Sequence, residues 1–364
     1  MMIDNNLARH LRRLGGELPS SSDRTGPKRK SPENWLFFSN GRAALAWMIE
    51  RCNVRSVILC AYTCPVLPPF FRKLGLAVGI YDVAATEAEI ASIALSLPSP
   101  RLVLVPALFG SAPLMDVRAL SAALDNNDYV TVDAAQSAFG HEEYSPPLRG
   151  GVLSCLRKTT SLTDGSILVI SGTGKPKIDG LPTADASTAL KKKAREIWAT
   201  GDADLERQAL DFNAQSEANW PNTPHRITPE ALEQFEILDR AWHVERRRRN
   251  RALLLKKLSP VIPFWLPDNG TPYSLPVFVT DAASVMKKMH ARRIFVSRLW
   301  PDTEHEPALH TAAAWMAEHL ISLPIDQQCD EADIARIATA INEIARPAPI
   351  PPQSIRQFVG TTSN

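Results

Sequence analysis

The sequence predicts an α/β protein with a large, doubly wound domain followed by a smaller α/β unit. Short, nearly continuous apolar runs at 57–60, 77–83, 102–108 and 129–134 are typical of strands buried on both faces of a parallel sheet. A helix is expected between the last two runs, over 116–124, and such alternation of strands and helices indicates a doubly wound fold. The length of 364 residues accommodates both units.

Further elements extend each unit. In the first, Asn40 can cap a helix, and strands are expected over 151–156 and 167–171, followed by a polar helical stretch over 175–222 and a long helix from about 229 to about 258. In the second, we expect strands near 274–279, 294–297 and 320–323 and helices over 282–292 and 331–344. The predicted organisation is a polar N-terminal segment (1–30), a large domain (31–245), a small C-terminal domain (246–346) and an irregular Pro-rich tail (347–364).

Composition excludes several classes of protein. A formal net charge of +2 gives no overall basic field for nucleic acid, and the basic run at 246–249 is interpreted as a solvated helix face. No apolar stretch is long enough to cross a bilayer, and the polar N-terminal segment lacks the apolar core of a signal peptide. The five scattered cysteines fit neither a disulfide framework nor a zinc site. A cytoplasmic protein without a bound metal is therefore expected.

Two charged residues stand at the ends of neighbouring predicted strands. Asp133 lies at the edge where α/β sheets bind ligands, although an aspartate there can also simply cap the next helix. Lys158 follows the next strand, with Ser154 shortly before it. Burial lowers the pKa of a lysine, and the neutral amine is the form that attacks an aldehyde. A single loop lysine is usually a solvated charge, so this hypothesis depends on the combination with Asp133.

A third element, SNGRAA at 39–44, is a turn that leads into a helix. Gly41 allows the backbone to approach an anion, and the free N–H groups of a first helical turn can bind phosphate. Many helices begin in this way, so the motif is informative only together with Asp133 and Lys158.

In this order and spacing, the three elements resemble the DegT/StrS family of sugar aminotransferases, which have the type I fold of pyridoxal-phosphate (PLP) enzymes. The segment DAAQ at 133–136 is identical to a motif of that family. Similar segments are SNGRAAL (39–45), AYTCP (61–65), LFGSAPLMD (108–116), TPYSLP (271–276), VSRLWP (296–301) and SLP (322–324), so the resemblance covers roughly 35–345. It implies the aspartate-aminotransferase fold, with a mostly parallel central sheet flanked by helices in the large domain.

The resemblance also implies roles for individual residues. Lys158 would hold PLP as a Schiff base and shuttle a proton, and Asp133 would pair with the protonated pyridine nitrogen. The other implied contacts with the cofactor come from Gln136 near the phenolic oxygen, from Ser154 with the backbone at Gly41 and Arg42 at the phosphate, and from Cys64 at the position of a stacked aromatic residue. Loosely matched candidates for substrate contacts are Tyr62, His225, Arg226 and Arg298.

Three departures from the family pattern lie near where an acceptor would enter. Ser154 precedes Lys158 by one residue fewer than in the family's S-F-x-x-x-K, Cys64 offers less surface than an aromatic ring, and Pro224 stands where the family has asparagine. Arg157 is a neighbouring competitor of Lys158, but its guanidinium stays protonated and cannot form a Schiff base. An atypical acceptor site is therefore expected.

We accordingly expect a homodimeric aminotransferase with shared active sites, which moves an amino group from an amino acid such as glutamate to a keto-sugar, nucleotide-linked or not, or to a related carbonyl compound. One alternative is another reaction on the same fold and cofactor, such as that of a dehydratase or an acyl or side-chain transferase. Dehydratases that resemble the family replace the lysine with histidine, whereas this chain has Lys158. Another alternative is a non-catalytic binding protein of this fold, which the joint presence of Asp133, Gln136, Ser154 and Lys158 disfavours.

Overall fold

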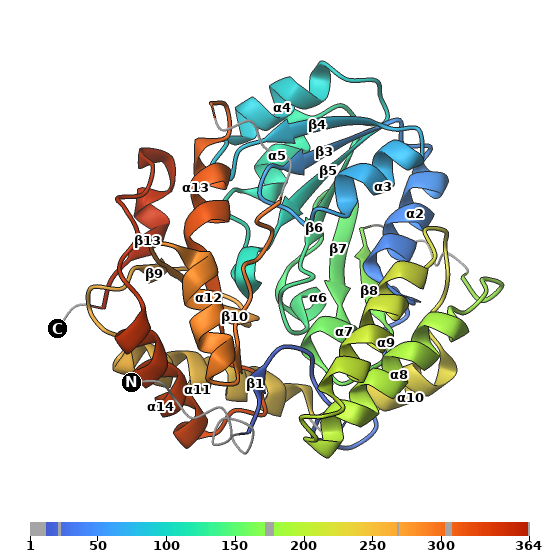
Figure 1. Cartoon of the computed structure of the whole chain (residues 1–364). Coiled ribbons are helices and arrows are strands. Elements are labelled where there is room, and N and C mark those ends of the chain that lie inside the picture. Colours follow the sequence, from blue (N-terminus) through green and yellow to red (C-terminus); the bar gives the residue numbers. More distant parts are fainter. Residues whose placement is uncertain (1–11, 21–22, 172–177, 268, 303–307, 363–364) are drawn as a thin grey trace.

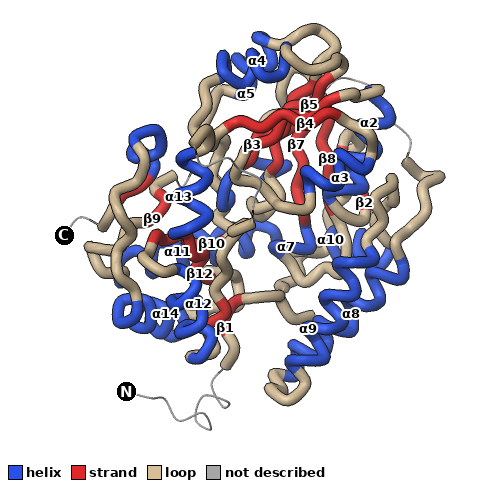
Figure 2. Tube along the Cα trace, turned by 45° about the horizontal axis from the view of Figure 1, so that its top comes forward, coloured by secondary structure: helices blue, strands red, loops and turns tan. Residues whose placement is uncertain are grey.

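The computed structural model describes residues 12–20, 23–171, 178–267, 269–302 and 308–362, and every structural statement below concerns these residues. Two main sheets and their helices make up the molecule (Figures 1 and 2). The large sheet has the strand order β2-β8-β7-β6-β5-β3-β4. Its strands are β2 (Trp35–Phe38), β3 (Ser56–Cys60), β4 (Ala77–Tyr81), β5 (Arg101–Pro106), β6 (Tyr129–Asp133), β7 (Gly150–Cys155) and β8 (Ser166–Ile170).

The large sheet is mostly parallel, as the apolar runs predict. Strands β4, β3, β5, β6 and β7 run in one direction, and β8 runs antiparallel between β7 and β2. The chain order reverses between β3 and β5, and doubly wound sheets bind ligands at the carboxyl ends of their strands near such a reversal. The predicted doubly wound fold is confirmed.

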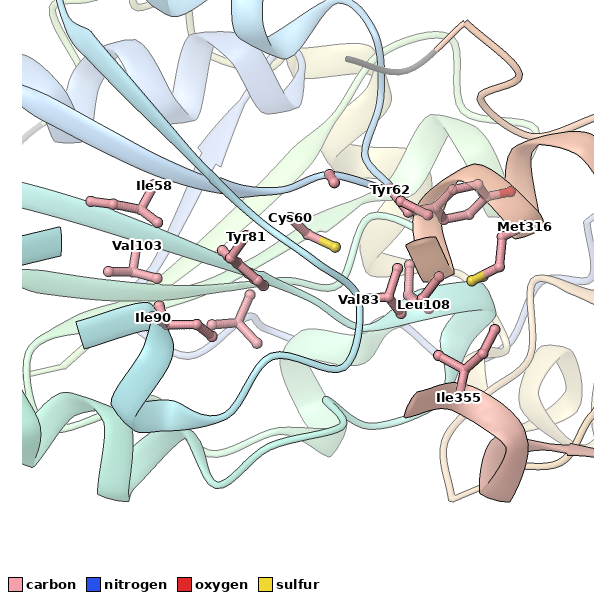
Figure 3. Packing of buried hydrophobic residues seen from close by; sticks show 14 of the residues in the cluster. Ile58, Cys60, Tyr62, Tyr81, Val83, Ile90, Val103, Leu108, Met316 and Ile355 are labelled. Atoms are coloured by element: carbon pink, nitrogen blue, oxygen red, sulfur yellow. The ribbon is translucent and has the colours of Figure 1, made fainter. Parts of the chain in front are cut away.

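Helices cover both faces of this sheet. Helices α2 (Gly41–Cys52) and α3 (Leu67–Lys73) pack on one face, and α4 (Glu87–Leu95) and α5 (Val117–Ala123) pack on the other (Figure 1). Successive residues of a strand point to opposite faces, so Leu59 packs with the first pair of helices while Ile58 and Cys60 pack with the second. Figure 3 shows the apolar core on the side of α4 and α5, which is called the second core here. The large unit also contains η1 (Leu108–Gly110), α6 (Gly140–Glu143), α7 (Leu156–Thr159), α8 (Asp185–Thr200) and α9 (Glu206–Asn219).

The smaller sheet is antiparallel, in the order β12-β10-β9-β13. Its strands are β9 (Phe264–Trp265), β10 (Ser274–Phe278), β12 (Leu320–Pro324) and β13 (Val359–Gly360), and its helices are α12 (Ala282–Ala291), α13 (Thr311–His319) and α14 (Glu331–Ile344). The second α/β unit expected from the sequence is therefore present. The residue boundaries that we assigned between the domains stay predictions.

Three sequence predictions about elements were wrong. The single helix expected over 229–258 is two helices, α10 (Pro229–Glu236) and α11 (Arg240–Lys257), because Asp239 starts a new helix by accepting the N–H of Trp242. The strand expected over 294–297 is shortened to β11 (Ile294–Phe295), which pairs with β1 (Leu14–Gly15) outside the small sheet. The tail expected to be irregular forms η2 (Gln353–Phe358) and then β13, at the edge of the small sheet.

In the described part of the chain, no helix combines the length and the apolar character that crossing a membrane requires.

Candidate functional site

A cavity of about 220 Å³ lies at the carboxyl ends of β6 and β7 and is called the first cavity here. Its wall brings together five residues that the sequence predicts at one site: Gly41, Arg42, Cys64, Asp133 and Lys158. They come from the start of α2, the loop after β3, the end of β6 and the short helix α7 that follows β7. Residues far apart in the sequence therefore meet because parallel strands end at the same edge.

The N-terminus of α2 faces the first cavity. The Asn40 side chain accepts the N–H of Ala43 at 3.1 Å, which caps the helix, while the N–H groups of Gly41 and Arg42 have no acceptor among the described residues. An anion site, suited to a phosphate, is formed by these two N–H groups, the positive end of the helix dipole and the Arg42 guanidinium.

Asp133 contributes a negative charge to the same wall. One of its oxygens accepts the N–H of Ala135 at 3.0 Å, which is the turn that a capping aspartate would make. Burial raises the pKa of Asp133, and the positive charge of Lys158 and the Ala135 N–H only partly oppose this shift. The carboxylate is thus short of a cationic partner, so a protonated ring nitrogen in the cavity would stabilise it.

The pKa of Lys158 is shifted in the direction opposite to our sequence expectation. Burial lowers it, as expected, but the coulombic influence of Cys155, Cys64 and Asp133 outweighs burial, and the net pKa is raised. The reason is that the Asp133 carboxylate and two cysteine sulfurs lie near this lysine, so its pocket is not purely apolar. A cationic group bound beside Asp133 would offset part of that negative field and favour the neutral amine.

The position of Ser154 gives no support to its predicted contact with the phosphate. Side chains alternate along a strand, and Leu153 and Cys155 both line the first cavity, so Ser154 points to the other face of the sheet. There its hydroxyl accepts the N–H of His141 at 2.8 Å, and the residue is 1% exposed. The single residue by which the Ser–Lys spacing departs from the family pattern is enough to reverse the side of the strand on which the serine lies.

Gln136 and Cys64 have different positions relative to the cavity. Gln136 is buried outside the cavity wall, and its side-chain oxygen accepts the N–H of Phe109 at 2.9 Å. Cys64 lies in the wall, where its small side chain covers less of a bound ring than an aromatic residue would. The predicted contact of Gln136 with a phenolic oxygen therefore has no support from its position, whereas the contact of Cys64 with a bound ring stays a prediction.

The predicted substrate contacts are not brought into this wall. Tyr62 is fully buried in the second core, beside α13 (Figure 3), and its hydroxyl donates to the carbonyl of Leu299 at 2.6 Å, so its position gives the predicted substrate contact no support. Arg298 donates to the carbonyl of Ala317 at 3.0 Å. His225 and Arg226 run beside β2, and neither lines the cavity.

Sequence reasoning missed a second cavity, of about 360 Å³, on the other side of Lys158. Lys158 and Arg157 line both cavities, and the second is also lined by Arg13, Arg247 and Tyr273. The TPYSLP motif at 271–276 was a signal for Tyr273, which we had matched to the family without assigning it a role. Arg13 was missed because the N-terminal segment was set aside as a polar extension.

Arg157 and Glu217 form a rigid polar wall between α7 and α9. Both terminal nitrogens of the Arg157 guanidinium donate to the Glu217 carboxylate, and the guanidinium lies 5.3 Å from the ring centre of Trp220. Burial would raise the pKa of Glu217, but Arg157 and Lys191 outweigh it and lower the pKa to about 2. Because Arg157 is engaged in this ion pair, Lys158 is the available amine of the two neighbours.

Asp164 anchors the loop after Lys158 and makes stability depend on pH. It is fully buried, and its two oxygens accept the N–H and the hydroxyl of Thr228, each at 2.9 Å. Burial raises the pKa of Asp164 to about 6, despite these two hydrogen bonds. Because the folded pKa exceeds the unfolded one, this contribution to stability is present below about pH 4 and is lost as the pH rises through about 6.

We therefore expect wild-type protein to lose about 2 to 3 kcal/mol of unfolding free energy, relative to Asp164→Asn, between about pH 4 and pH 7. Urea unfolding of both proteins across this range measures the difference. A difference that is constant with pH, or that grows in the opposite direction, would contradict the assignment.

Comparison with known proteins supports the fold. No family profile matches the chain, and no curated protein matches its sequence. Among solved structures, DesI, determined with its TDP-sugar product, is 14% identical over 92% of this chain and 93% of its own, with a TM-score of 0.59. A DegT/DnrJ/EryC1/StrS aminotransferase from Brucella abortus is 15% identical over 85% and 86% of the two chains, with a TM-score of 0.58.

Sugar aminotransferase CalS13 from Micromonospora echinospora is 16% identical over 94% of this chain and 97% of its own, with a TM-score of 0.56. At such low identity these likenesses establish the fold. The chain has the type I fold of PLP-dependent aminotransferases over nearly its whole length.

Proposed function

We propose that this protein is a PLP-dependent aminotransferase of the DegT/StrS type, with Lys158 as the residue that carries the cofactor. One observation carries the proposal: a single cavity brings together the Lys158 amine, the Asp133 carboxylate and the free N–H groups of Gly41 and Arg42. An amine, a carboxylate and an anion site are the groups that would hold the aldehyde, the ring nitrogen and the phosphate of PLP. The structurally similar protein Spr1654 from Streptococcus pneumoniae has been solved in both its PLP and PMP forms.

PLP, when bound, supplies an aldehyde and an electron-accepting ring. The residues of this chain would hold the cofactor and move the proton. Lys158 can attach to a carbonyl carbon through Nζ and, once released, can hold and move a proton at that atom. Asp133 favours a protonated ring nitrogen because its buried carboxylate needs a cation, and the start of α2 with Arg42 binds a phosphate.

The proposed acceptor is a keto-sugar or another polar carbonyl compound, with an amino acid such as glutamate as the donor. Similarity to DesI, which was solved with a TDP-sugar product, supports the sugar. The departures from the family pattern at Cys64, Ser154 and Pro224 support an acceptor that is not necessarily nucleotide-linked.

We expect glutamate to bleach the visible band of the PLP-loaded protein and a polar ketone to restore it. Absorbance measured after the addition of each acceptor tests this expectation. Rapid recovery of the visible band with nucleotide-linked keto-sugars alone would contradict an atypical acceptor site. Recovery of the band with 2-oxo acids alone would contradict the assignment of a sugar as the acceptor.

We also propose a homodimer with active sites at the subunit interface, because the resemblance to the DegT/StrS family implies cofactor sites that are shared between two chains. Light scattering of the purified protein is expected to give twice the mass of the 40.1 kDa chain. A stable monomer that retains full activity would contradict the proposal. The proposed compartment is the cytoplasm, because all five cysteines are free thiols.

A further inference from the structure

An N-terminal strap, defined as residues 12–20, crosses the molecule beside the second cavity. Its strand β1 pairs with β11, and Glu17 binds Lys191 of α8 at 3.0 Å. Both views show β1 between α12 of the small unit and the α8–α9 pair (Figures 1 and 2). The strap therefore connects the two units and supplies part of the wall through which a substrate would reach Lys158.

Arg13 of the strap has an uncommon environment for an arginine. Its guanidinium lies 4.9 Å from the ring of Trp198 and 4.9 Å from the ring of Phe295. Among the described residues, no carboxylate lies within ion-pair distance of it, and its Nε is buried without a hydrogen-bond partner. Two aromatic rings thus hold the guanidinium flat and leave its donor groups free for a ligand.

A second arginine contributes to the same cavity. Arg247 of α11 is 1% exposed, and its terminal nitrogens donate to the carbonyls of Tyr273 at 2.9 Å and Thr159 at 3.2 Å. It too forms no ion pair with a described carboxylate, and its Nε has no hydrogen-bond partner. Its positive charge is therefore buried beside carbonyl dipoles, and the carboxylates of Asp326 and Asp23 act on it only at longer range.

The acidic groups in the wall do not cancel this charge. Glu17 faces the cavity, but it is engaged with Lys191 and Arg195. Asp326 faces it as well, with one oxygen accepting the N–H of Gln328 at 3.1 Å. Arg13, Arg247 and Lys158 thus leave an excess of positive charge in a space of about 360 Å³.

We propose that the second cavity binds an anionic group of the substrate, a carboxylate or a phosphate, and that Arg13 of the N-terminal strap is the specificity-determining residue that recognises it. The inference rests on the proposed function, because Lys158 separates this cavity from the one assigned to PLP. A substrate whose reacting carbon approaches Lys158 would extend its anion toward Arg13 and Arg247. The volume fits an amino acid or a single sugar and lies at the low end for small-molecule sites.

The test is a calorimetric titration of the full-length, PLP-loaded protein with glutarate and, separately, with inorganic phosphate. Arg13→Gln removes the charge, Arg13→Lys keeps the charge without the planar fork, and Arg12→Gln is the matched control. Arg12 is the neighbour on the strap, but it binds Asp333 at 2.9 Å and does not line the second cavity. We expect Arg13→Gln to weaken binding of one anion by roughly ten- to a hundredfold, and Arg12→Gln to change it by less than about twofold.

The anion whose affinity falls identifies the anionic group of the substrate. A weaker affinity for glutarate indicates a carboxylate, and a weaker affinity for inorganic phosphate indicates a phosphate. Arg13→Lys guards against misfolding: it retains the cationic contact with the two rings and should lose part of the affinity while keeping the thermal midpoint. Equal affinity in wild type and Arg13→Gln, an equal loss in Arg12→Gln, or no binding of either anion to wild type would overturn the proposal. Borohydride trapping at Lys158 reports on the proposed function separately and should be unchanged in every variant.

Discussion

Replacement of Lys158 by alanine is expected to abolish both covalent attachment of PLP and turnover. Wild-type protein treated with borohydride should carry a reduced adduct on the peptide that contains Lys158, and the variant should carry none. Turnover should fall by more than roughly 10⁴-fold, because one side chain supplies both the covalent link and the moving proton. Peptide mapping by mass spectrometry and steady-state kinetics measure the two losses.

The matched control for this experiment is Lys192→Ala. Lys192 lies on α8, is 48% exposed in its side chain and forms a surface ion pair with Glu230 at 2.9 Å, so its loss should leave the adduct and the activity unchanged. An adduct on any lysine other than Lys158, or normal turnover in Lys158→Ala, would show that the first cavity is not the cofactor site.

Asp133→Asn is expected to retain PLP and to lose most of the rate. Asparagine can still accept the N–H of Ala135, but its neutral amide cannot balance a protonated ring nitrogen. We expect kcat to fall by on the order of 10²-fold or more, and by a similar factor with the amino donor and with the acceptor, because the same ring accepts electrons in both directions. Stopped-flow measurement of each half-reaction tests this expectation.

A control separates this role from helix capping. Asp116 accepts the N–H groups of Arg118 and Ala119 at the start of α5, outside both cavities, and asparagine is as good a cap as aspartate. If Asp133 were only a cap, Asp133→Asn would behave like Asp116→Asn and keep a normal kcat. The two variants should instead have similar stability and very different rates.

Most strands of the large sheet could be predicted because they are largely apolar and are separated by polar turns or helices. Strand β2 and helices α3, α4 and α13 were not predicted: β2 has four residues, and α3 contains two consecutive prolines near its start. The break between α10 and α11 was also missed, because the sequence on both sides of Asp239 continues a helical pattern. In that case a side-chain cap decides where the second helix begins.

The positions of candidate site residues follow from the sequence where strand ends determine them. They do not follow from it where the face of a strand or a contact between distant segments determines them. Asp133 and Lys158 meet because β6 and β7 are adjacent and parallel. Family spacing alone does not indicate the face of β7 on which Ser154 lies. A buried tyrosine and a binding tyrosine look the same in sequence, and the structure places Tyr62 in the core, with a hydrogen bond to the carbonyl of Leu299. Arg13 lies beside the second cavity because β1 pairs with β11. A strand of only two residues cannot be predicted from its sequence.

The end of the chain has a consequence for how this protein can be handled. Strand β13 pairs with β9 and covers what would otherwise be an open sheet edge, and Ile355 in the preceding turn is fully buried against the core around α13. A version shortened before Gln353 would expose the hydrogen-bonding groups of β9 and leave a hole in the core where Ile355 packs. Such a chain would tend to associate through that edge. A purification tag is therefore better added after Asn364 than used to replace the residues from Gln353 onward.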